Sequence, residues 1–437
     1  MPDYRAEAFR LAWNGFRRRC ASRRWKTDGD LVKLAYFVKP HLGGTYTVFR
    51  QLRKGLLAHG IDVQWVGLSH DAREAVAWTD TSENGVLLHT ESCNSEKQQA
   101  EAIMAALHER GFDGVFVNVL ADRVQMNLAR YLPAKMLRIM IVHNITPGTY
   151  AAARALRDYV HATVGVSQRC RRDLIVRHGF PVSRTFAIPN AMEVEALPAA
   201  NRHREPGAPL KVLYLGRVED ASKGVFWLPE IMATLTEPVT LTVAGDGPDL
   251  EALKKRLEPH AASTTFLGAV SPDQVPETLA SHDVLLMPSR FEGFGLTLLE
   301  AMAAGCVPVV SDISGVTDTI AENDVSGILF PIGDWRAAAR SIDELARNPQ
   351  RLAAMSVDAR HRVEEKFGLK RMAGSYARLI SDMVHQRPTI ALPLPMDEWA
   401  TPLGLRAGLR TYLPAPVKNW LRVARERWYR NPSRDAA

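Results

Sequence analysis

Few cysteines and no long apolar run characterise this sequence of 437 residues, and each absence excludes a class of protein. The four cysteines lie far apart without a CxxC pair, so neither a zinc site nor a disulfide framework is indicated, and we expect a reduced, cytosolic protein. The longest nearly apolar run, residues 301–310, is interrupted by Gly305 and Pro308. It falls short of the ~18 residues that cross a bilayer, so no transmembrane helix is expected.

The signatures of several enzyme classes are also missing. The loops at 245–250 and 293–298 each contain a GxG but lack the third glycine of a dinucleotide fingerprint. The P-loop signature and the HExxH pair of zinc proteases are absent, and residues 165–169 miss the GxSxG elbow of lipases. Residues 1–30 lack the apolar stretch of about 7 to 15 residues that a secretory signal needs, so no signal peptide is expected.

The net charge of +7 is carried by the two ends of the chain. Residues 1–30 and residues 388–437 each contain eight basic and four acidic side chains, whereas residues 31–387 hold 39 basic and 40 acidic ones. Five of the nine tryptophans also lie in the two ends. This mixture favours contact with an anionic membrane surface, and no nucleic-acid partner is expected, although the same residues could serve packing and solubility alone.

Short runs of Val, Ile and Leu alternate with segments of helical period, which is the pattern of βα units around parallel sheets. We therefore expect an α/β protein of two doubly wound, Rossmann-like domains facing a cleft. The expected divisions are a basic aromatic extension at 1–30, a first domain at 31–195, a linker at 196–209, a second domain at 210–387 and a Pro-rich basic tail at 388–437. We expect this tail to pack back on the first domain or on a membrane, and residues 417–430 to form a basic amphipathic helix.

Residues 288–312 form the most informative stretch of the sequence. A strand is expected to end there, a loop with Gly293 and Gly295 follows, and a helix begins near Leu296. Such a loop exposes backbone amides at the positive end of a helix. Amides in that position are suited to binding phosphate.

Two glutamates are placed around this loop. Glu300 lies about 6 to 8 Å along the expected helix from its start. A carboxylate there can accept both hydroxyls of a ribose diol while the amides hold a diphosphate. Glu292, in the loop, would then face the far side of the diphosphate, where a sugar would lie.

This segment resembles the retaining family 4 glycosyltransferases of GT-B fold, in which seven residues separate two glutamates, as they do Glu292 and Glu300. The resemblance extends from about residue 32 to residue 385, and the further matches occur in the family's order. They are the glycine pair Gly43 and Gly44, His143, the GR…KG segment at Gly216, Arg217, Lys223 and Gly224, the GxGP turn at 245–248, and Ser289 before the acidic motif.

The resemblance implies a transferase whose second domain binds a nucleotide-diphosphate sugar, whose first domain binds the acceptor, and whose tail crosses back over the first domain. The leaving diphosphate would help to deprotonate the acceptor, and neither glutamate is an established nucleophile. The implied catalytic set is His143, Arg217, Lys223 and Glu292. The implied donor-binding set is Gly43, Gly44, Gly216, Gly293, Phe294, Gly295, Leu296, Thr297 and Glu300.

Two positions depart from the family pattern. Asn190 is followed by Ala191 rather than glycine, and alanine tolerates a positive φ poorly, so the backbone entering the linker is in question. The glycine pair is followed by Thr45 and Tyr46 instead of a small residue and glutamate. Acceptor contacts therefore cannot be transferred from the family.

A cationic pair has a clear chemical role in such a reaction. Cleavage of the bond between sugar and nucleotide leaves a diphosphate that gains negative charge, and a positive group must stabilise it. Arg217 and Lys223, with the amides at the helix start, could replace a metal ion, so we expect no metal and no cofactor. Asp28 and Asp30 form a DxD, but they precede the first strand in the basic extension, which argues against a metal site.

Each candidate also has a purely structural interpretation. Arg217 and Lys223 could be solvated surface charges. Glu300 could be an acid favoured by the helix dipole. His143 could be a hydrogen-bonded core histidine, and the glycine pair at 43 and 44 could be only a turn.

The sequence thus predicts a retaining, metal-independent glycosyltransferase that moves a hexose-type sugar to a glycan or lipid-linked acceptor, in polysaccharide or lipopolysaccharide assembly. We expect it to be cytoplasmic and peripheral on the inner face of the membrane. Two other functions remain open: a nucleotide-sugar epimerase or hydrolase of similar architecture, and a non-catalytic scaffold that binds sugar nucleotides.

Overall fold

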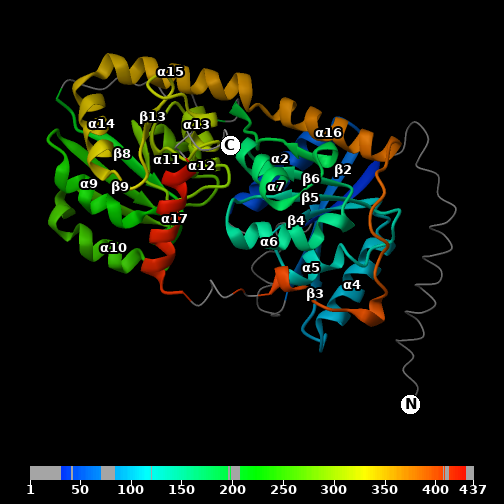
Figure 1. Ribbon diagram of the computed structural model, residues 1–437. Coiled ribbons are helices and arrows are strands. Elements are labelled where there is room, and N and C mark those ends of the chain that lie inside the picture. Colours follow the sequence, from blue (N-terminus) through cyan, green and yellow to red (C-terminus); the bar gives the residue numbers. More distant parts are fainter. Residues whose placement is uncertain are drawn as a thin grey trace. The chain divides into compact units, whose positions relative to one another are not determined.

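The structure is a computed structural model with two parallel β-sheets built by βα repeats (Figure 1). It describes residues 31–40, 43–69, 84–119, 121–194, 197, 207–406, 408 and 413–429. The chain divides into two units, and neither is a single continuous segment. The described residues of unit 1 fall within Met1–Val166, Arg171–Ile188 and Met372–Ala407, and those of unit 2 within Ser167–Cys170, Pro189–Arg371 and Gly408–Ala437.

Unit 1 contains a sheet of strand order β3-β2-β1-β4-β5-β6-β7 with parallel pairs throughout. The strand order reverses at β1, and in sheets of this kind ligands bind at the carboxyl ends of the strands beside the reversal. The strands are β1 (Val32–Phe37), β2 (Ile61–Ser69), β3 (Gly85–His89), β4 (Gly114–Asn118), β5 (Leu137–Val142), β6 (Ala162–Gly165) and β7 (Thr185–Ala187). The helices are α2 (Gly44–Leu57), α4 (Glu96–Glu109), α5 (Arg123–Leu128) and α6 (Pro147–Leu156). Two further helices, α7 (Gln168–His178) and α16 (Leu369–His385), belong to unit 1 only from residues 171 and 372 onward.

Unit 2 contains a sheet of strand order β10-β9-β8-β11-β12-β13, which reverses at β8. The strands are β8 (Leu210–Leu215), β9 (Val239–Ala244), β10 (Thr264–Gly268), β11 (Val284–Met287), β12 (Val307–Ser311) and β13 (Ile328–Phe330). The helices are α8 (Asp220–Lys223), α9 (Leu228–Thr234), α10 (Leu250–Leu257), α11 (Val275–Ala280), α12 (Leu296–Ala303), α13 (Thr317–Ile320), α14 (Trp335–Arg347), α15 (Pro349–Lys366) and α17 (Ala415–Tyr429).

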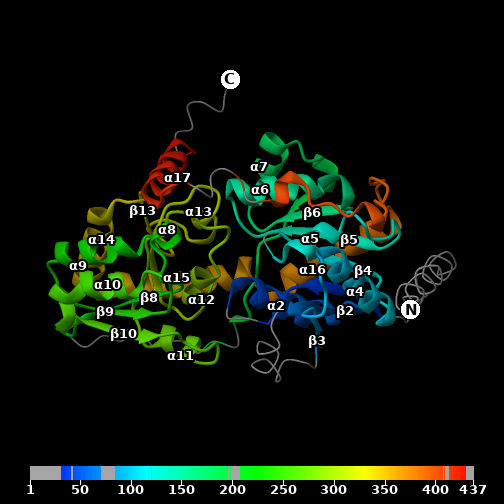
Figure 2. The ribbon, with the colours of Figure 1, turned by 90° about the horizontal axis from the view of Figure 1, so that it is seen from below.

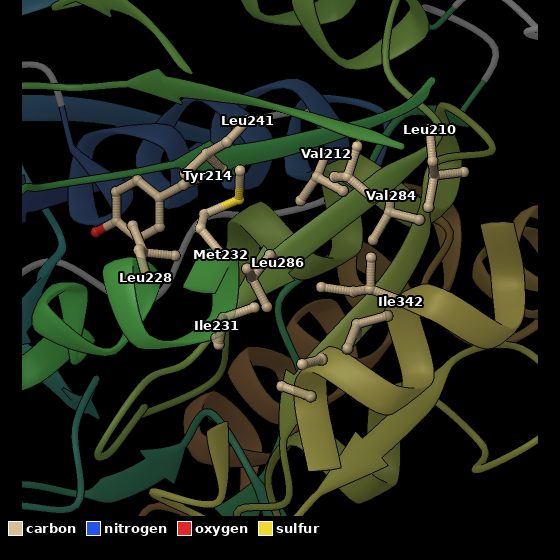
Figure 3. Packing of buried hydrophobic residues seen from close by; sticks show 14 of the residues in the cluster. Leu210, Val212, Tyr214, Leu228, Ile231, Met232, Leu241, Val284, Leu286 and Ile342 are labelled. Atoms are coloured by element: carbon tan, nitrogen blue, oxygen red, sulfur yellow. The ribbon is translucent and has the colours of Figure 1, made fainter. Parts of the chain in front are cut away.

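The core of unit 2 explains why its sequence reads as short apolar runs. The sheet contributes Val212 and Leu286, and the helices α9 and α14 contribute Ile231 and Ile342 to the same buried cluster (Figure 3). Because helices cover parallel sheets on both faces, strands such as β11 and β12 are buried along their whole length. Each fully buried aliphatic side chain of this kind contributes roughly 1.5 to 3 kcal/mol.

The second domain was expected to end at residue 387, but this segment of unit 2 ends at Arg371. From Met372 onward α16 belongs to unit 1, where Tyr376 packs edge-on against Phe116 of β4 with ring centroids 6.0 Å apart. The change of unit falls three residues after the start of α16, and nothing in the sequence of this helix marks it.

The Pro-rich tail expected at 388–437 is divided between the two units. Residues 388–406 pack on unit 1, where the amides of Ala391 and Leu394 donate to the carbonyls of Asp158 and Arg130. Trp399 lies over Tyr131 at 4.6 Å between ring centroids. The helix α17, in contrast, belongs to unit 2, where it lies by α8 (Figure 2).

Other expectations fall partly or wholly outside the described residues. These include the basic extension at 1–30 with Asp28 and Asp30, and most of the linker at 196–209. Ala191 is described, and Asp324 is the non-glycine with positive φ among the described residues. Alanine after Asn190 therefore introduces no backbone strain.

Candidate functional site

Two glycine turns follow β8 and β9 and pack directly against each other. The amide of Gly216 donates to Ala244 at 3.0 Å, and a Cβ on Gly245 would lie 1.9 Å from the carbonyl oxygen of Gly216. Gly216 and Gly245 both adopt positive φ, at 151° and 144°. Glycine is thus required at position 216 by its conformation, and at position 245 by close backbone approach as well.

Lys223 is positioned by the short helix that follows the first of these turns. It is the last residue of α8, and Gly224 ends the helix in the left-handed conformation at φ 64°. A Cβ on Gly224 would lie 2.2 Å from the carbonyl oxygen of Pro288. The close approach of these two segments brings Lys223 beside the loop that follows β11.

Lys223 forms an ion pair with Glu292 in this loop. The ammonium Nζ lies 2.5 Å from the carboxylate Oε1, and the hydroxyl of Ser289 donates to the same oxygen at 2.7 Å. Both charged side chains are largely buried, with 28% of Lys223 and 11% of Glu292 exposed. The structure thus joins two of the expected catalytic residues, which lie 69 positions apart in the sequence.

A buried arginine holds the two segments together. Arg290 donates through Nη2 to both carboxylate oxygens of Asp220, at 2.9 and 2.8 Å, and through Nε to its carbonyl at 2.8 Å. Its guanidinium lies 3.9 Å from the ring centroid of Trp227. Sequence reasoning missed this brace, since the only available signal was the position of Asp220 and Arg290 close to Lys223 and Glu292.

Arg217 lies in a different setting from Lys223. Its side chain is 67% exposed, and a guanidinium nitrogen lies 3.6 Å from the carboxylate of Glu219. It follows the carboxyl end of β8 as expected, but the structure pairs it with Glu219 and not with Glu292. A distant, exposed pair of this kind holds the arginine weakly.

The glycine-rich loop ends at the first turn of α12. Gly295 caps this helix in a left-handed conformation at φ 102°, and the helix begins at Leu296. Phe294 is buried and lies edge-on to Phe367, with ring centroids 6.0 Å apart. The first amides of a helix have no intrahelical acceptor, so those at Leu296 and Thr297 are available to an anion.

Glu300 lies one turn into α12. Its side chain is partly exposed, and within the described part of the chain its carboxylate has no hydrogen-bond or ion-pair partner. Desolvation by burial raises the pKa of this carboxyl to about 7. A carboxylate that is held without a partner is suited to accept hydrogen bonds from a diol.

In unit 1, His143 follows β5 and is oriented by an asparagine that sequence reasoning missed. Asn118, at the end of β4, donates through Nδ2 to the carbonyl of Phe37 at 2.9 Å, so its Oδ1 accepts from His143 Nε2 at 2.8 Å. Burial lowers the pKa of His143 to about 4. The imidazole is therefore neutral near pH 7, with Nδ1 as an acceptor.

The glycine pair lies at the start of α2 in unit 1. Gly43 is the N-cap in an extended conformation, and Gly44 is the first helical residue. Both are exposed. The amides of Tyr46 and Thr47 already donate to the carbonyl of Gly43, at 3.2 Å each. Donor contact by this pair stays a prediction.

Among the described residues, no three His, Cys, Asp or Glu side chains come together in a group that could hold a metal ion. No described helix is long and apolar enough to cross a membrane.

Residues 199–362 match the family model described as Glycosyl transferases group 1, which is less than half of the chain. Glycogen synthase from Mycobacterium tuberculosis (strain CDC 1551 / Oshkosh) is 29% identical over 214 residues, which are 47% of this chain and 51% of that protein. A phosphatidyl-myo-inositol mannosyltransferase from Mycobacterium leprae (strain TN) is 31% identical over 200 residues, which are 45% of this chain and 52% of that protein. The chain thus spans about half the length of these curated relatives.

A solved structure resembles most of this chain. The crystal structure of Anabaena Alr3699/HepE in complex with UDP and glucose matches with a TM-score of 0.66 at 16% identity, covering 80% of this chain and 100% of that chain. At such low identity the likeness establishes the fold, which is GT-B with two Rossmann-like domains. The expected α/β class with two doubly wound, Rossmann-like domains is confirmed.

Proposed function

We propose that this protein is a retaining, metal-independent glycosyltransferase that moves a hexose-type sugar from a nucleotide-diphosphate sugar to a glycan or lipid-linked acceptor. The observation that carries the proposal is the Lys223–Glu292 pair beside the amide-bearing start of α12. A second carboxylate, that of Glu300, lies on the same helix without a partner in the described chain. The family match of this segment supports the same function.

The donor would lie along the start of α12. The amides of Leu296 and Thr297, with Lys223 and Arg217, would hold the diphosphate, and Glu300 would accept the ribose hydroxyls. Glu292 would accept hydroxyls of the sugar. Lys223 then has two anionic neighbours in the bound state, so its ammonium stays neutralised whether or not the donor is present.

The reaction would require cleavage of the bond between the sugar and the diphosphate. Negative charge then grows on the diphosphate, and Lys223 and the helix amides would stabilise it. The acceptor oxygen would bond to the sugar carbon on the same face that the diphosphate leaves, and the leaving diphosphate would take the proton of the acceptor hydroxyl. His143, neutral because of its lowered pKa, would position the sugar or its acceptor and would not serve as the base.

The acceptor class is proposed from the similar proteins and from the charge of the chain. Their names include a glycogen synthase and a phosphatidyl-myo-inositol mannosyltransferase, which act on a polysaccharide and a lipid. The basic aromatic ends of this chain suit an anionic membrane. We therefore propose assembly of a cell-surface polysaccharide or lipopolysaccharide at the cytoplasmic face of a membrane.

A panel of nucleotide sugars tests the proposal. A donor that binds should raise the midpoint of thermal unfolding. Its sugar should be transferred to an added glycan or lipid-linked acceptor, and NMR of the product should show the same anomeric configuration as in the donor. Product formed without any acceptor would instead indicate an epimerase or hydrolase. Donor binding without turnover on any acceptor would indicate a sugar-nucleotide scaffold.

A further inference from the structure

The helix α17 in unit 2 has its polar side turned toward the protein. Asn419 donates to the carboxylate of Asp220 at 3.3 Å, and Arg422 donates to the carbonyl of Ala221 at 2.6 Å. One turn further on, the buried Glu426 accepts from Arg169 at 2.9 Å. These three α17 residues are spaced by three and four positions, so they share one face of the helix.

The opposite side of α17 is apolar and exposed. Trp420 is 68% exposed, Val417 43% and Leu421 42%, and Ala424 is exposed as well. Their spacing of three and four positions puts them on one stripe. Surface helices of globular proteins bury their apolar stripe and expose their polar one, so the orientation of α17 is inverted.

Basic residues lie on both sides of the apolar stripe. At 100° per residue, Arg425 and Lys418 lie along one edge and Arg427 along the other. Residues 413–429 contain four basic side chains and one acidic one, or +3. The acidic one is Glu426, which is paired with Arg169 on the protein side.

We propose that this outer face of α17, formed by Val417, Trp420, Leu421 and Ala424, docks on an anionic lipid surface. An apolar stripe with basic flanks is the arrangement of helices that lie in the plane of a bilayer interface. The stripe enters the acyl boundary, and the basic flanks contact anionic headgroups. The inference rests on the proposed function in one respect, because it names the surface that carries a lipid-linked acceptor.

The same flanks disfavour the other occupants of an apolar face. A second copy docked through this face would bring basic edges against basic edges, and like charges in contact weaken an interface. A protein partner would need an acidic rim around an apolar groove. An anionic bilayer supplies both the apolar interior and the negative charge.

Docking through α17 would also bring the donor site to the lipid surface. The guanidinium of Arg422 lies 4.7 Å from the ring centroid of Phe291, the residue before Glu292. Ala221, whose carbonyl Arg422 contacts, lies two positions before Lys223. The proposed docking face and the proposed catalytic pair are therefore held on one packed group of elements.

The test uses the full chain and vesicles of two compositions, phosphatidylcholine alone and phosphatidylcholine mixed with phosphatidylglycerol. In flotation, the protein should bind the mixed vesicles far more strongly, and added salt should weaken the binding. In the double variant Trp420→Ala, Leu421→Ala, the affinity for the mixed vesicles should fall by at least about tenfold. A matched control, Leu392→Ala with Leu403→Ala, removes two side chains that are 82% and 83% exposed in unit 1, and it should bind as the parent does.

Three results would overturn the inference. The first is that the α17 variant binds the mixed vesicles as tightly as the parent. The second is that the control variant loses as much affinity for the vesicles as the α17 variant does. The third is that sedimentation shows a dimer in the parent that the α17 variant lacks, while the variant keeps its affinity for vesicles. Nucleotide-sugar binding without vesicles is measured on the same samples. If the α17 variant loses vesicle binding but still binds the donor, the loss is due to the docking face alone and supports the inference. If the parent binds vesicles but binds no donor, the result contradicts the proposed function and not the docking of α17.

Discussion

Replacement of Glu300 by glutamine should stabilise the free protein at alkaline pH and weaken its binding of the donor. Burial raises the pKa of the Glu300 carboxyl from an ordinary 4.5 to about 7. The difference corresponds to about 3 kcal/mol of unfolding free energy. Because the side chain is partly exposed, solvent screening reduces the expected difference to about 2 kcal/mol.

The sign follows from the protonation of the two states. Below about pH 4.5 the carboxyl is protonated in both states, so Glu300→Gln should change the stability little. Between pH 4.5 and about 7 the unfolded state ionises while the folded state keeps its proton, so the parent loses stability as the pH rises. Above about pH 7 the parent carries the full penalty of a buried carboxylate, and the variant carries none.

Urea unfolding at about pH 4.5 and about pH 8 measures this difference, and calorimetry with a nucleotide-diphosphate sugar measures the binding. The parent should bind the donor more tightly as the pH rises through about 7, since the carboxylate is the form that accepts the ribose hydroxyls. Glu300→Gln should bind weakly with little dependence on pH. Glu230→Gln, at an exposed position in the first turn of α9, is the matched control and should follow the parent.

Two results would refute the reasoning separately. If Glu300→Gln gains no stability at about pH 8, or gains as much at about pH 4.5, burial does not hold the pKa of this carboxyl high. If the variant gains the stability but binds the donor as tightly as the parent, Glu300 does not contact the ribose.

Three further predictions concern Lys223, metal ions and Arg290. Lys223→Ala should lower kcat by about 10² to 10³ if the ammonium acts like one oxyanion donor. The control Lys254→Ala removes an exposed pair with Glu251 and should leave kcat unchanged. If Lys223→Ala and the parent have equal kcat, Lys223 has no part in the mechanism. Turnover should survive EDTA, and strict dependence on Mn²⁺ or Mg²⁺ would contradict the assignment of Arg217 and Lys223 to the diphosphate. Arg290→Leu strands the buried Asp220 carboxylate and should lower the urea unfolding free energy by about 3 kcal/mol; a loss under about 0.5 kcal/mol would show that the brace is dispensable.

The presence of two parallel sheets could be predicted from the sequence because buried parallel strands leave a local signal. The run at 239–244 is apolar or β-branched throughout, and it forms β9. The unit to which a helix belongs leaves no such signal. The apolar face of α16 would suit either sheet, and its contact between Tyr376 and Phe116 joins residues that are far apart in the chain.

The candidate site was predictable only where residue type and short spacing carry the chemistry. Glu292, Glu300 and the glycines between them lie within one loop and one helix, so their proximity follows from local structure. The contact between Asp220 and Arg290 depends on how two loops meet after neighbouring strands, and the raised pKa of Glu300 depends on packing. Neither property can be derived from composition or period.

The discontinuity of both units has a consequence for biosynthesis. The sheet of unit 1 leaves the ribosome early, but the helix that supplies Tyr376 to its core is translated only after all of 189–371. The N-terminal half therefore cannot mature vectorially, and it must wait for a segment encoded near the end of the message. A premature stop shortly after codon 371 would leave the strands of the second sheet in place but would remove α16 and residues 388–406 from unit 1. A deletion that begins near residue 372 therefore damages the N-terminal unit as well as removing α17 from unit 2.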